Sequence, residues 1–600
     1  MTDYVELHCR SAFSFLRGAS TPEQFAERAA QLQMPAVALC DRDGLYGAPR
    51  FFSRAKELGI RPIVGAELTI EDGTILPVLA QSRRGYENLC WLLTRAHLRN
   101  EKGKCSVHWD ELPEFAEGLV ALGNETILGS ARVSRAVFGV PPETSCGLST
   151  NGKNLFERKF GRDARTNTRD ACASHFIEKL LAIFGRENIF IELQRHRIRG
   201  EEKNVRALVE LAGQFHLPLL ATNGVLYSTE NERPILDVFT CIRNHTHLDA
   251  AGKLLEQNGE RYLKSAAQMR ELFRDLPEAI SNTVRLAERL DFTLENLGYE
   301  FPVFPVPGSA GVSMDSFLRE KAFEGARNRY KHLGKIPQKV RAQLENELAL
   351  IGKLKVAGYF LVVWDIVQFC REQNIMSQGR GSAANSTVCF CLGITNVDPL
   401  KFNTLFERFL TEGRKNSWPD IDIDLPSGDR RERVIQEIYK RYGERGAAMT
   451  ANVITYRGRS AAREVGKALN LSPDILNRFS NLYANGDFPH TLDLQAQMEK
   501  SGLPKSHPRA ATFAAMCKAI HGLPRHLGQH SGGMIICQGK LDKIVPLENA
   551  SMPGRVVAQW DKDDCEDLGI IKVDLLGLGM MSVLQDSVEL TRQLGRPVDL

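Results

Sequence analysis

Residues 417–425, Ser-Trp-Pro-Asp-Ile-Asp-Ile-Asp-Leu, carry three acidic side chains at every second position. This two-residue period is that of a β-strand, because successive side chains of a strand point to opposite faces. Asp420, Asp422 and Asp424 would then share one face of the strand, with isoleucines on the other. Carboxylates this close repel one another and raise one another's pKa unless cations are near. The segment therefore predicts a strand with one acidic face that needs a source of positive charge.

Two interpretations of the acidic face remain open from this segment alone. Oxygen-only clusters suit Mg²⁺, which binds one or two carboxylates and leaves room for substrate phosphates. On that interpretation the segment is a divalent-metal site for phosphoryl transfer. On the other, it is a solvated acidic edge strand, and the rest of the sequence has to distinguish the two.

Length and composition limit what surrounds this strand. A chain of 600 residues is too long for one hydrophobic core, so we expect roughly two to four domains. The hydrophobic content of 43% and charged content of 25% are ordinary for a globular protein. The net charge of +4 is too small to indicate a nucleic-acid binder, so local basic patches would have to do so.

The cysteines and the start of the chain bear on the compartment. The 13 cysteines are odd in number and form no C-x-x-C pair, which favours reduced core thiols over disulfides or a zinc site. Residues 1–10 lack a signal-peptide pattern, and no apolar run reaches the ~18 residues of a membrane-spanning helix. We therefore expect a cytoplasmic protein.

Short apolar segments alternate with helical patterns over residues 1–300. Thr21-Pro22 supplies a helix cap and a proline at the first helical position. Repeated βα units of this kind predict a parallel sheet or barrel. The predicted strands are Ala36–Cys40, Ile63–Ile70, Leu76–Ala80, Leu119–Leu122, Ile189–Leu193 and Leu219–Thr222.

Polar residues follow several of these strands, where folds of this type carry their chemistry. Asp41, Glu67 and Asn223 stand at strand ends, and His8 lies in an expected earlier strand. This half of the chain resembles the polymerase-and-histidinol-phosphatase (PHP) domain, which implies a distorted α/β barrel that in many members holds a cluster of metal ions. The segments that carry the resemblance are Glu6–Ser11, Ser14–Ser20, Asp41-Arg42, Gly65–Glu67 and Ala221–Tyr227.

The sequence departs from the metal-binding pattern of that family. Arg10 replaces the second histidine of its His-x-His motif, Arg17 interrupts Leu-Asp-Gly-Ala, and Arg42 replaces the histidine of Asp-His. Gly224 and Leu226 stand where metal-binding members have the acid and histidine of Asn-Asp-x-His. An arginine stays protonated and has no lone pair to offer a cation, so these positions cannot bind a metal.

Three of the family's ligands remain, namely His8, Asp41 and Glu67. We predict that the arginines replace the metals by ion pairs with Asp41 and Glu67. The PHP domain would then be a structural support without bound metal, exonuclease activity or phosphoesterase activity. The rival hypothesis is a metal-dependent phosphoesterase built on this barrel.

Residues 141–180 predict a polar loop or insert that contains the basic run Arg158–Arg169. A solvated loop is favoured over a DNA contact, and its role stays unassigned. His108, His175 and His196 have no partner at ligand spacing and are interpreted as ordinary residues.

The centre of the chain begins with a proline-rich linker, Phe301–Gly308. The pattern then predicts a helical stretch over 313–352 and a buried helix that starts near Gly358. The glycine-rich segment Gln378–Ser386 precedes an apolar helical segment, 387–392. Exposed amides at such a helix N-terminus bind anions, so we expect an anion site here.

The glycine-rich segment lacks the spacing of a P-loop, but it stands shortly before the acidic strand. We interpret it as a cradle for a nucleoside triphosphate opposite the metals. Arg380, Gly381 and Ser382 are the expected donors, with Arg408 and Arg414 near enough in sequence to reach the same phosphates.

The centre resembles the palm of bacterial C-family DNA polymerases, the replicative alpha-subunit family. This implies a fold similar to polymerase-β nucleotidyltransferases, with Asp420 and Asp422 as catalytic metal ligands and Asp424 in support. The segments that carry the resemblance are Gly379–Ser382, Leu405–Leu410 and Pro419–Asp424.

The last third opens with a predicted amphipathic helix at Arg433–Tyr442. Farther on, Arg457 is followed by Arg459, Arg463 and Lys467 at helical spacing. This basic stripe suits duplex phosphates, and a solvated helix face explains it equally well.

Asp574 is a single acid within the apolar run 569–577, and a buried acid needs a partner. It either caps the helix that follows residue 577 or supplies the third carboxylate of a two-ion clamp. The family resemblance supports the second interpretation and places Lys572 near the incoming nucleotide.

Three later segments resemble the error-prone, damage-associated branch of the family more than the replicative one, although a replicative-type subunit and a catalytically silent scaffold remain alternatives. They are Pro524–His526, Asn549–Arg555 and Gln559–Cys565. The resemblance implies an error-prone DNA-directed DNA polymerase with two Mg²⁺, primer-template DNA and deoxynucleoside triphosphates. It also implies a sliding clamp and damage-response proteins as partners, bound through regions that family members carry beyond this sequence.

The predicted fold class is a multidomain α/β chain. We expect a PHP domain over 1–300, a palm over 301–445 and 524–578, and a helical thumb-like insertion over 446–523. Residues 579–600 would begin the fingers, so we expect an N-terminal part of a longer polymerase whose activity alone is weak or absent.

Overall fold

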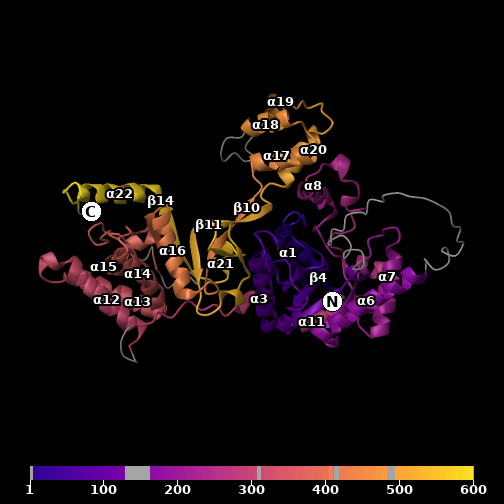
Figure 1. Cartoon of the computed structure of the whole chain (residues 1–600), viewed down its shortest axis with the longest axis horizontal. Helices are drawn as coiled ribbons and strands as arrows, with labels where there is room; N and C mark the ends of the chain where they lie inside the picture. Colours follow the sequence, from indigo (N-terminus) through magenta and orange to yellow (C-terminus); the bar gives the residue numbers. More distant parts are fainter. Residues whose placement is uncertain are drawn as a thin grey trace, which may run out of the picture. The chain divides into compact units, whose positions relative to one another are not determined.

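The computed structural model describes residues 4–128, 163–306, 312–404, 406, 409–410, 418–482 and 494–598. The chain forms two compact units (Figure 1). The first unit combines Met1–Leu294 with Val453–Leu527, and the second combines Glu295–Asn452 with Gly528–Leu600. The predicted insertion therefore groups with the N-terminal half of the chain, although it interrupts the predicted palm in sequence.

The first unit contains a curled mixed sheet of seven strands in sequence order. All six predicted strands are confirmed, and His8 lies in the expected earlier strand. A parallel bridge between Cys9 and Val225 joins the first strand to the segment that follows the last, so the sheet curls toward closure. The strands are β1 (Glu6–Cys9), β2 (Ala36–Arg42), β3 (Arg61–Thr69), β4 (Ile75–Ala80), β5 (Leu119–Gly123), β6 (Ile189–Leu193) and β7 (Leu219–Ala221).

The predicted parallel arrangement is interrupted at β4, which runs antiparallel to both neighbours. The link between β3 and β4, residues 70–74, is too short for the crossover that a parallel pair requires. Elsewhere helices return the chain in parallel, and the capping box of Thr21 and Gln24 begins the first of them as predicted. Helices α1 (Pro22–Gln31), α2 (Ala48–Glu57) and α7 (Glu201–Phe215) link parallel strands, whereas α3 (Arg83–Arg99) links the antiparallel β4 and β5, and α11 (Pro277–Arg289) follows β7.

The prediction of a loop through residue 180 is wrong for its last part. Helix α6 spans Asp163–Phe184. Its second half carries Phe176, Ile177 and Leu180, which recur at helical spacing and are buried. The basic sequence before them obscured this apolar face, and the remainder of the predicted loop lies outside the described residues.

The predicted thumb-like insertion is helical and shares a hydrophobic core with the PHP-like part of the first unit. The ring of Tyr456 stacks on Phe239 of α8 (Arg233–Arg243), with 5.7 Å between the centroids. Arg509 donates to both carboxylate oxygens of Asp249, at 2.7 and 2.9 Å. The helices of the insertion are α17 (Gly458–Ala468), α18 (Pro473–Leu482), α19 (Leu494–Lys500) and α20 (Ala510–Ala519).

The second unit is built on another seven-stranded sheet, in the order β12-β13-β10-β11-β14-β9-β8. Strands β9 and β14 run parallel side by side, while β8 and β11 flank them in the antiparallel sense. Strands distant in sequence are thereby brought together. They are β8 (Gln378–Arg380), β9 (Asp422–Pro426), β10 (Ala447–Thr455), β11 (Pro524–Ile536), β12 (Leu547–Asn549), β13 (Val556–Ala558) and β14 (Lys572–Leu578).

A group of helices accompanies this sheet (Figure 1). The expected single helical stretch over 313–352 is instead two helices, because Gly334 adopts a left-handed φ of 70° and Pro337 caps the second. No helix in the described parts of the chain is long and apolar enough to cross a membrane. The helices of this unit include α12 (Met314–Arg329), α13 (Gln338–Lys353), α14 (Ala357–Glu372), α15 (Thr387–Leu392), α16 (Asp429–Tyr442) and α22 (Gly579–Gln593).

The N-terminus of α15 does not have the free amides that we expected. The buried carboxylate of Glu347 accepts from the backbone N–H groups of Thr387 (2.9 Å) and Val388 (3.0 Å) and from the hydroxyl of Ser386 (2.8 Å). An internal carboxylate already compensates this helix end. A phosphate on the glycine-rich segment would therefore have to use groups other than these amides.

We predict that Glu347→Gln weakens this helix end, because its amide nitrogen would face N–H donors. The expected loss is about 2–3 kcal/mol of opening free energy, measured by hydrogen exchange of the amides at 386–393. Glu345→Gln is the matched control. Glu345 lies on the same helix but pairs with Arg319 at the surface, so its loss should cost about 0.5 kcal/mol or less. Equal effects of the two substitutions would contradict the assignment.

Candidate active site

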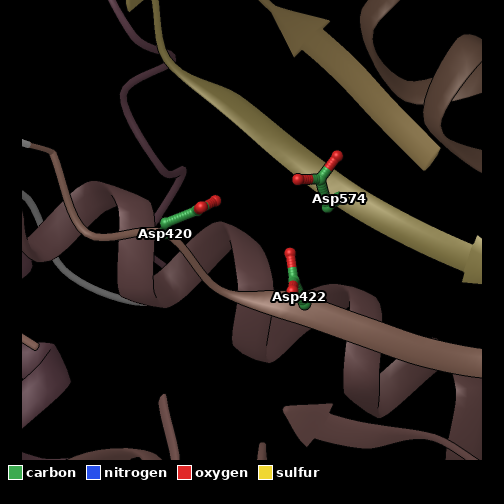
Figure 2. Close-up of side chains that lie close together, drawn as sticks. All are labelled: Asp420, Asp422 and Asp574. Atoms are coloured by element: carbon green, nitrogen blue, oxygen red, sulfur yellow. The ribbon is translucent and has the colours of Figure 1, made fainter. Parts of the chain in front are cut away.

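Three carboxylates of the second unit converge. Asp420, Asp422 and Asp574 each offer an oxygen within 4.8 Å of the others. Asp422 and Asp574 are register partners on the parallel strands β9 and β14, while Asp420 lies two residues before β9 begins. Figure 2 shows the three side chains directed toward one another. The predicted strand is thus shorter than its sequence pattern, but the first two acids meet the distant third.

The segment that carries Asp420 is fixed from behind. The backbone N–H of Ile421 donates to the hydroxyl of Tyr359, at 3.0 Å. Tyr359 and Ile421 are both buried, so this bond anchors the chain between two of the acids. The predicted buried helix, α14, thereby positions the site.

The three acids differ in exposure. The side chain of Asp420 is 50% exposed, that of Asp422 is 25% exposed and that of Asp574 is 8% exposed. The cluster is therefore open on the side of Asp420 and closed behind Asp574. The alternative in which Asp574 caps the following helix is wrong, because Asp574 lies within β14 and Leu578 is the N-cap of α22.

Two cationic side chains, one from each of the strands that flank β9, balance the acids. Lys572 contacts Asp574 and lies 2.9 Å from Asp420. Arg380 of β8 donates from Nε to Asp424 at 3.0 Å, and its Nη2 lies 3.5 Å from Asp422. Asp424 therefore holds an arginine beside the cluster.

The electrostatics of the cluster favour an added cation. Burial and the charges of Asp420 and Asp574, opposed by Arg380 and Lys572, together raise the pKa of Asp422 to about 6. Burial lowers the pKa of Lys572, but the charges of Asp574 and Asp420 outweigh it and raise that pKa. Asp420 and Asp574 thus make Asp422 harder to ionise, which a divalent ion would relieve.

An unsatisfied oxygen supports the same conclusion. Oδ1 of Asp574 is buried and has no hydrogen-bond partner among the described residues. Nδ1 of His530 lies 3.8 Å away, but that nitrogen accepts from the N–H groups of Gly532 and Gly533. A buried carboxylate oxygen without a donor fits a hard cation. The residues present therefore suit a divalent metal.

Close packing around Asp574 explains one of the glycines. A Cβ on Gly533 would collide with Oγ1 of Thr450 and lie 3.2 Å from Oδ1 of Asp574. Gly533 is the register partner of Asp574 across β11 and β14. A larger residue would displace the carboxylate.

The glycine-rich segment lies against the acids. Oγ of Ser382 donates to the backbone carbonyl of Asp420 at 2.9 Å. Gly381 adopts a left-handed φ of 71°, and a Cβ there would lie 3.7 Å from Asp422. The structure thus brings Arg380, Gly381 and Ser382 to the cluster, while Arg408 and Arg414 lie outside the described residues.

The predicted DNA-binding residues lie in the first unit. Arg457, Arg459, Arg463 and Lys467 are all exposed, and the last pairs with Glu464 at 3.2 Å. Arg459, Arg463 and Lys467 lie on the side of α17 away from its buried alanines, and Arg457 is its N-cap residue. The stripe is therefore exposed, and its role stays a prediction.

The PHP-like part of the first unit holds the predicted ion pairs only in part. Glu67 is contacted by Nη2 of Arg10 (3.1 Å) and by Nε of Arg42 (2.7 Å), as expected. Asp41 instead accepts from the N–H and hydroxyl of Ser11 and from the hydroxyl of Ser14, each at 2.8 Å. The expected arginine pair with Asp41 is therefore wrong, because two serines from the chain start satisfy it.

Arg17 also departs from the prediction. Its Nη1 donates to the carbonyl of Phe15 at 3.5 Å, and within the described residues no carboxylate contacts it. Burial lowers its pKa, and the nearby charges of Arg42 and Arg243 lower it further.

Two polar residues of this part were not predicted from the sequence. Glu192 of β6 accepts from Nδ1 of His8 at 2.6 Å. His196, interpreted as ordinary, is buried and bonds to Glu201 (3.1 Å) and to the carbonyl of Asn223 (2.9 Å). The signal for Glu192 was present, since it is a lone acid in the apolar strand Ile189–Leu193, the same pattern that identified Asp574.

Two known protein families match this chain. The PHP domain matches residues 6–196, and the bacterial DNA polymerase III alpha NTPase domain matches residues 316–577. The fold is that of a PHP domain followed by a nucleotidyltransferase region of the polymerase III alpha type. The chain belongs to the bacterial DNA polymerase III alpha family, which confirms the predicted family and fold class and implies a dependence on divalent metal ions.

Curated relatives confirm the predicted branch. A protein named error-prone DNA polymerase from Rhodopirellula baltica is 38% identical over 600 residues, covering 98% of this chain and 48% of that protein. Proteins of the same name from Mycolicibacterium paratuberculosis and Mycobacterium tuberculosis are each 40% identical over 609 residues, covering 100% of this chain and 52% and 51% of those proteins. The chain spans about half the length of these relatives.

We predict a pH dependence of stability from His8, which donates to Glu192 and to Glu67 (2.8 Å). Burial lowers the pKa of His8, but the two carboxylates outweigh it and raise the pKa from 6.5 to about 10. The stabilisation is therefore complete below about pH 6.5 and is lost as pH rises through about 10, amounting to a value on the order of 4 kcal/mol.

Urea unfolding of the first unit between pH 6.5 and 9.5 measures this effect. The wild-type protein should lose stability across this range, and His8→Gln should remove most of the slope. His175→Gln, which changes a side chain that is 82% exposed, is the control and should leave the slope unchanged. A slope that persists in His8→Gln would assign it to another group.

Proposed function

We propose that this chain is the catalytic part of an error-prone DNA-directed DNA polymerase that uses two Mg²⁺ for template-directed nucleotidyl transfer in DNA repair and translesion synthesis. The observation that carries the proposal is the convergence of Asp420, Asp422 and Asp574 within 4.8 Å. The relatives named error-prone DNA polymerase support the substrate class. Primer-template DNA and deoxynucleoside triphosphates are then the substrates, in the cytoplasm.

The three acids are the proposed catalytic metal ligands. Bound ions at such a site would activate the primer 3′-hydroxyl and neutralise the triphosphate. Asp574, the most buried of the three, would fix the position of the site, and the exposed Asp420 would admit substrate. Asp424 would act through Arg380, which it holds beside Asp422.

The proposed contacts to the triphosphate come from β14 and from β8 with the turn that follows it. Lys572 links Asp420 and Asp574, so it compensates both acids. Once a bound metal ion compensates these two acids, the ammonium group of Lys572 is free to bind a phosphate. Arg380, Gly381 and Ser382 approach from the other side, and Arg408 completes the proposed set.

Further partners are also proposals. Arg457, Arg459, Arg463 and Lys467 would bind duplex phosphates from the exposed side of α17. A sliding clamp and damage-response proteins would bind through regions of the longer relatives that this chain does not span. In the PHP domain the ion pairs of Glu67 with Arg10 and Arg42 support a site without metal.

Metal binding tests the proposal on this chain itself. Titration with Mn²⁺, followed by electron paramagnetic resonance, should show binding that Mg²⁺ displaces. Asp420→Asn/Asp422→Asn should weaken it by at least about tenfold, because two of three anionic ligands are lost. Asp429→Asn, at an exposed acid in the first turn of α16, is the matched control. Equal binding by the double variant and the control would refute the metal site.

Primer extension by the whole polymerase tests catalysis. The same double variant should reduce the Mg²⁺-dependent rate by roughly 10³-fold or more, because the ions stabilise the charge of the transition state. Duplex binding should persist in that variant. Retained extension would place the chemistry elsewhere, and a wild-type protein that binds DNA without extending it would favour the scaffold.

We predict that the basic stripe contributes to duplex affinity in a salt-dependent way. Arg459→Gln/Arg463→Gln should lower affinity and reduce the slope of log K against log salt by about 2, since two phosphate contacts are lost. Fluorescence anisotropy over a salt series measures both. Lys203→Gln/Arg206→Gln, on the exposed side of α7, makes the same charge change in the same unit. Equal losses in both variants would show a nonspecific charge effect.

A further inference from the structure

The PHP domain retains a cleft where the family's metal site would lie. The cleft has a volume of about 610 Å³. His8, Arg10, Arg42, Glu67 and Arg261 are among the residues that line it. The former metal site is therefore an accessible cavity with arginines in its wall.

Arg10 and Arg42 share one carboxylate in this cleft. Glu67 is the one carboxylate that contacts them among the described residues, and it also accepts from His8, which Glu192 contacts as well. Arg261 pairs separately with Glu256 at 3.1 Å. The two arginines are thus only partly compensated.

Two further arginines add to the field. Arg17 contacts no carboxylate of the described chain, and Arg243 of α8 donates to the carbonyl of Leu16 at 3.1 Å. Burial and the charges of Arg42, Arg261 and Arg17, opposed by Glu67, together lower the pKa of Arg10 to about 10. The arginines repel one another, which an anion would relieve.

Several guanidinium donors of the cleft have no acceptor. Arg42 uses only Nε within the described residues, so both of its Nη groups are free to donate. Nε of Arg10 is buried and has no partner in the described chain. Buried or half-buried donors of this kind are costly unless something satisfies them.

A strained turn holds Arg17 in place. Phe15 and Leu16 have φ angles of 38° and 67°, which side chains other than glycine rarely adopt. A Cβ on Gly18 would collide with the carbonyl of Ser11, so the turn is also tightly packed. The backbone thus keeps a charge beside Arg42 at an energetic cost, a feature that is concentrated at functional sites.

We propose that this arginine-lined cleft binds a phosphate group, held by Arg10 and Arg42 and attracted by the field of Arg17, Arg243 and Arg261. Guanidinium groups pair with phosphate oxygens through two parallel N–H bonds, and the free Nη groups of Arg42 supply such a pair. The phosphate comes either from a small free anion or from a nucleic-acid strand. This site is distinct from the acidic cluster and does not depend on the proposed polymerase activity.

Calorimetric titration of the full chain with inorganic phosphate, pyrophosphate and a phosphorylated thymidine dinucleotide tests the proposal, with chloride at matched ionic strength as the reference. Arg42→Gln should weaken binding by about tenfold or more, because a charge-assisted pair is lost. Arg17→Gln should weaken it by a smaller factor. Arg54→Gln, a surface arginine of the same unit paired with Glu27 and Glu57, is the control and should bind as wild type.

The arms of the titration separate the two sources. Binding of inorganic phosphate or pyrophosphate, lost in Arg42→Gln, assigns a small free anion. Binding of the dinucleotide alone, lost in the same variant, assigns a nucleic-acid strand. Absence of binding in every arm, or equal losses in Arg54→Gln and Arg42→Gln, overturns the proposal.

Stability without phosphate gives an independent prediction. Arg17→Gln should raise the unfolding midpoint of the first unit in chloride buffer by about 1–3 °C, because it removes repulsion with Arg42 and Arg243. Addition of phosphate should then stabilise wild type more than the variant. A purely structural role for Arg17 predicts the opposite, a lower midpoint, and that result would overturn the proposal.

Discussion

The register between two parallel strands determines what the second unit can do. Asp422 of β9 and Asp574 of β14 are paired directly, although a long excursion of the chain separates them. The opposite faces of these strands are apolar, and Ile423 and Leu575 are fully buried. A slip of one residue would turn every side chain of a strand to the other face, exposing the apolar set and separating the acids. Burial of the apolar face therefore holds the carboxylates together against their mutual repulsion.

The two units solve the problem of clustered charge differently. In the second unit, Lys572 and Arg380 balance the acids but leave one buried oxygen of Asp574 without a partner. In the first, both oxygens of Glu67 are occupied, one by His8 and Arg10 and the other by Arg42. The acidic cluster of the second unit is therefore open to a cation, whereas the site around Glu67 in the first unit is filled by fixed cationic side chains. The buried atoms left without a partner are also of opposite kind, an acceptor oxygen of Asp574 and a donor nitrogen of Arg10, which is why we infer metal binding at one site and phosphate binding at the other.

The sequence predicts these features where the cause is local. Alternation identified the acidic face of β9, and a single acid in an apolar run identified Asp574. The same rule, applied to the apolar strand β6, would have identified Glu192 as well. Features set by distant contacts were not predictable in this way. Glu347 occupies the N-terminus of α15, and Ser11 satisfies Asp41, because the tertiary fold brings them there.

Packing against the insertion gives the PHP domain a structural role that does not depend on metal binding. The insertion is small, and a segment of its size buries a smaller fraction of its surface than a larger domain does. Its core continues into α8, where Phe239 stacks on Tyr456, and the pair of Arg509 and Asp249 adds a polar contact. The basic residues of α17 lie on the helix whose other face joins this core. Substitution of metal ligands in the PHP domain leaves this apolar core in place, because His8, Asp41 and Glu67 are not part of it.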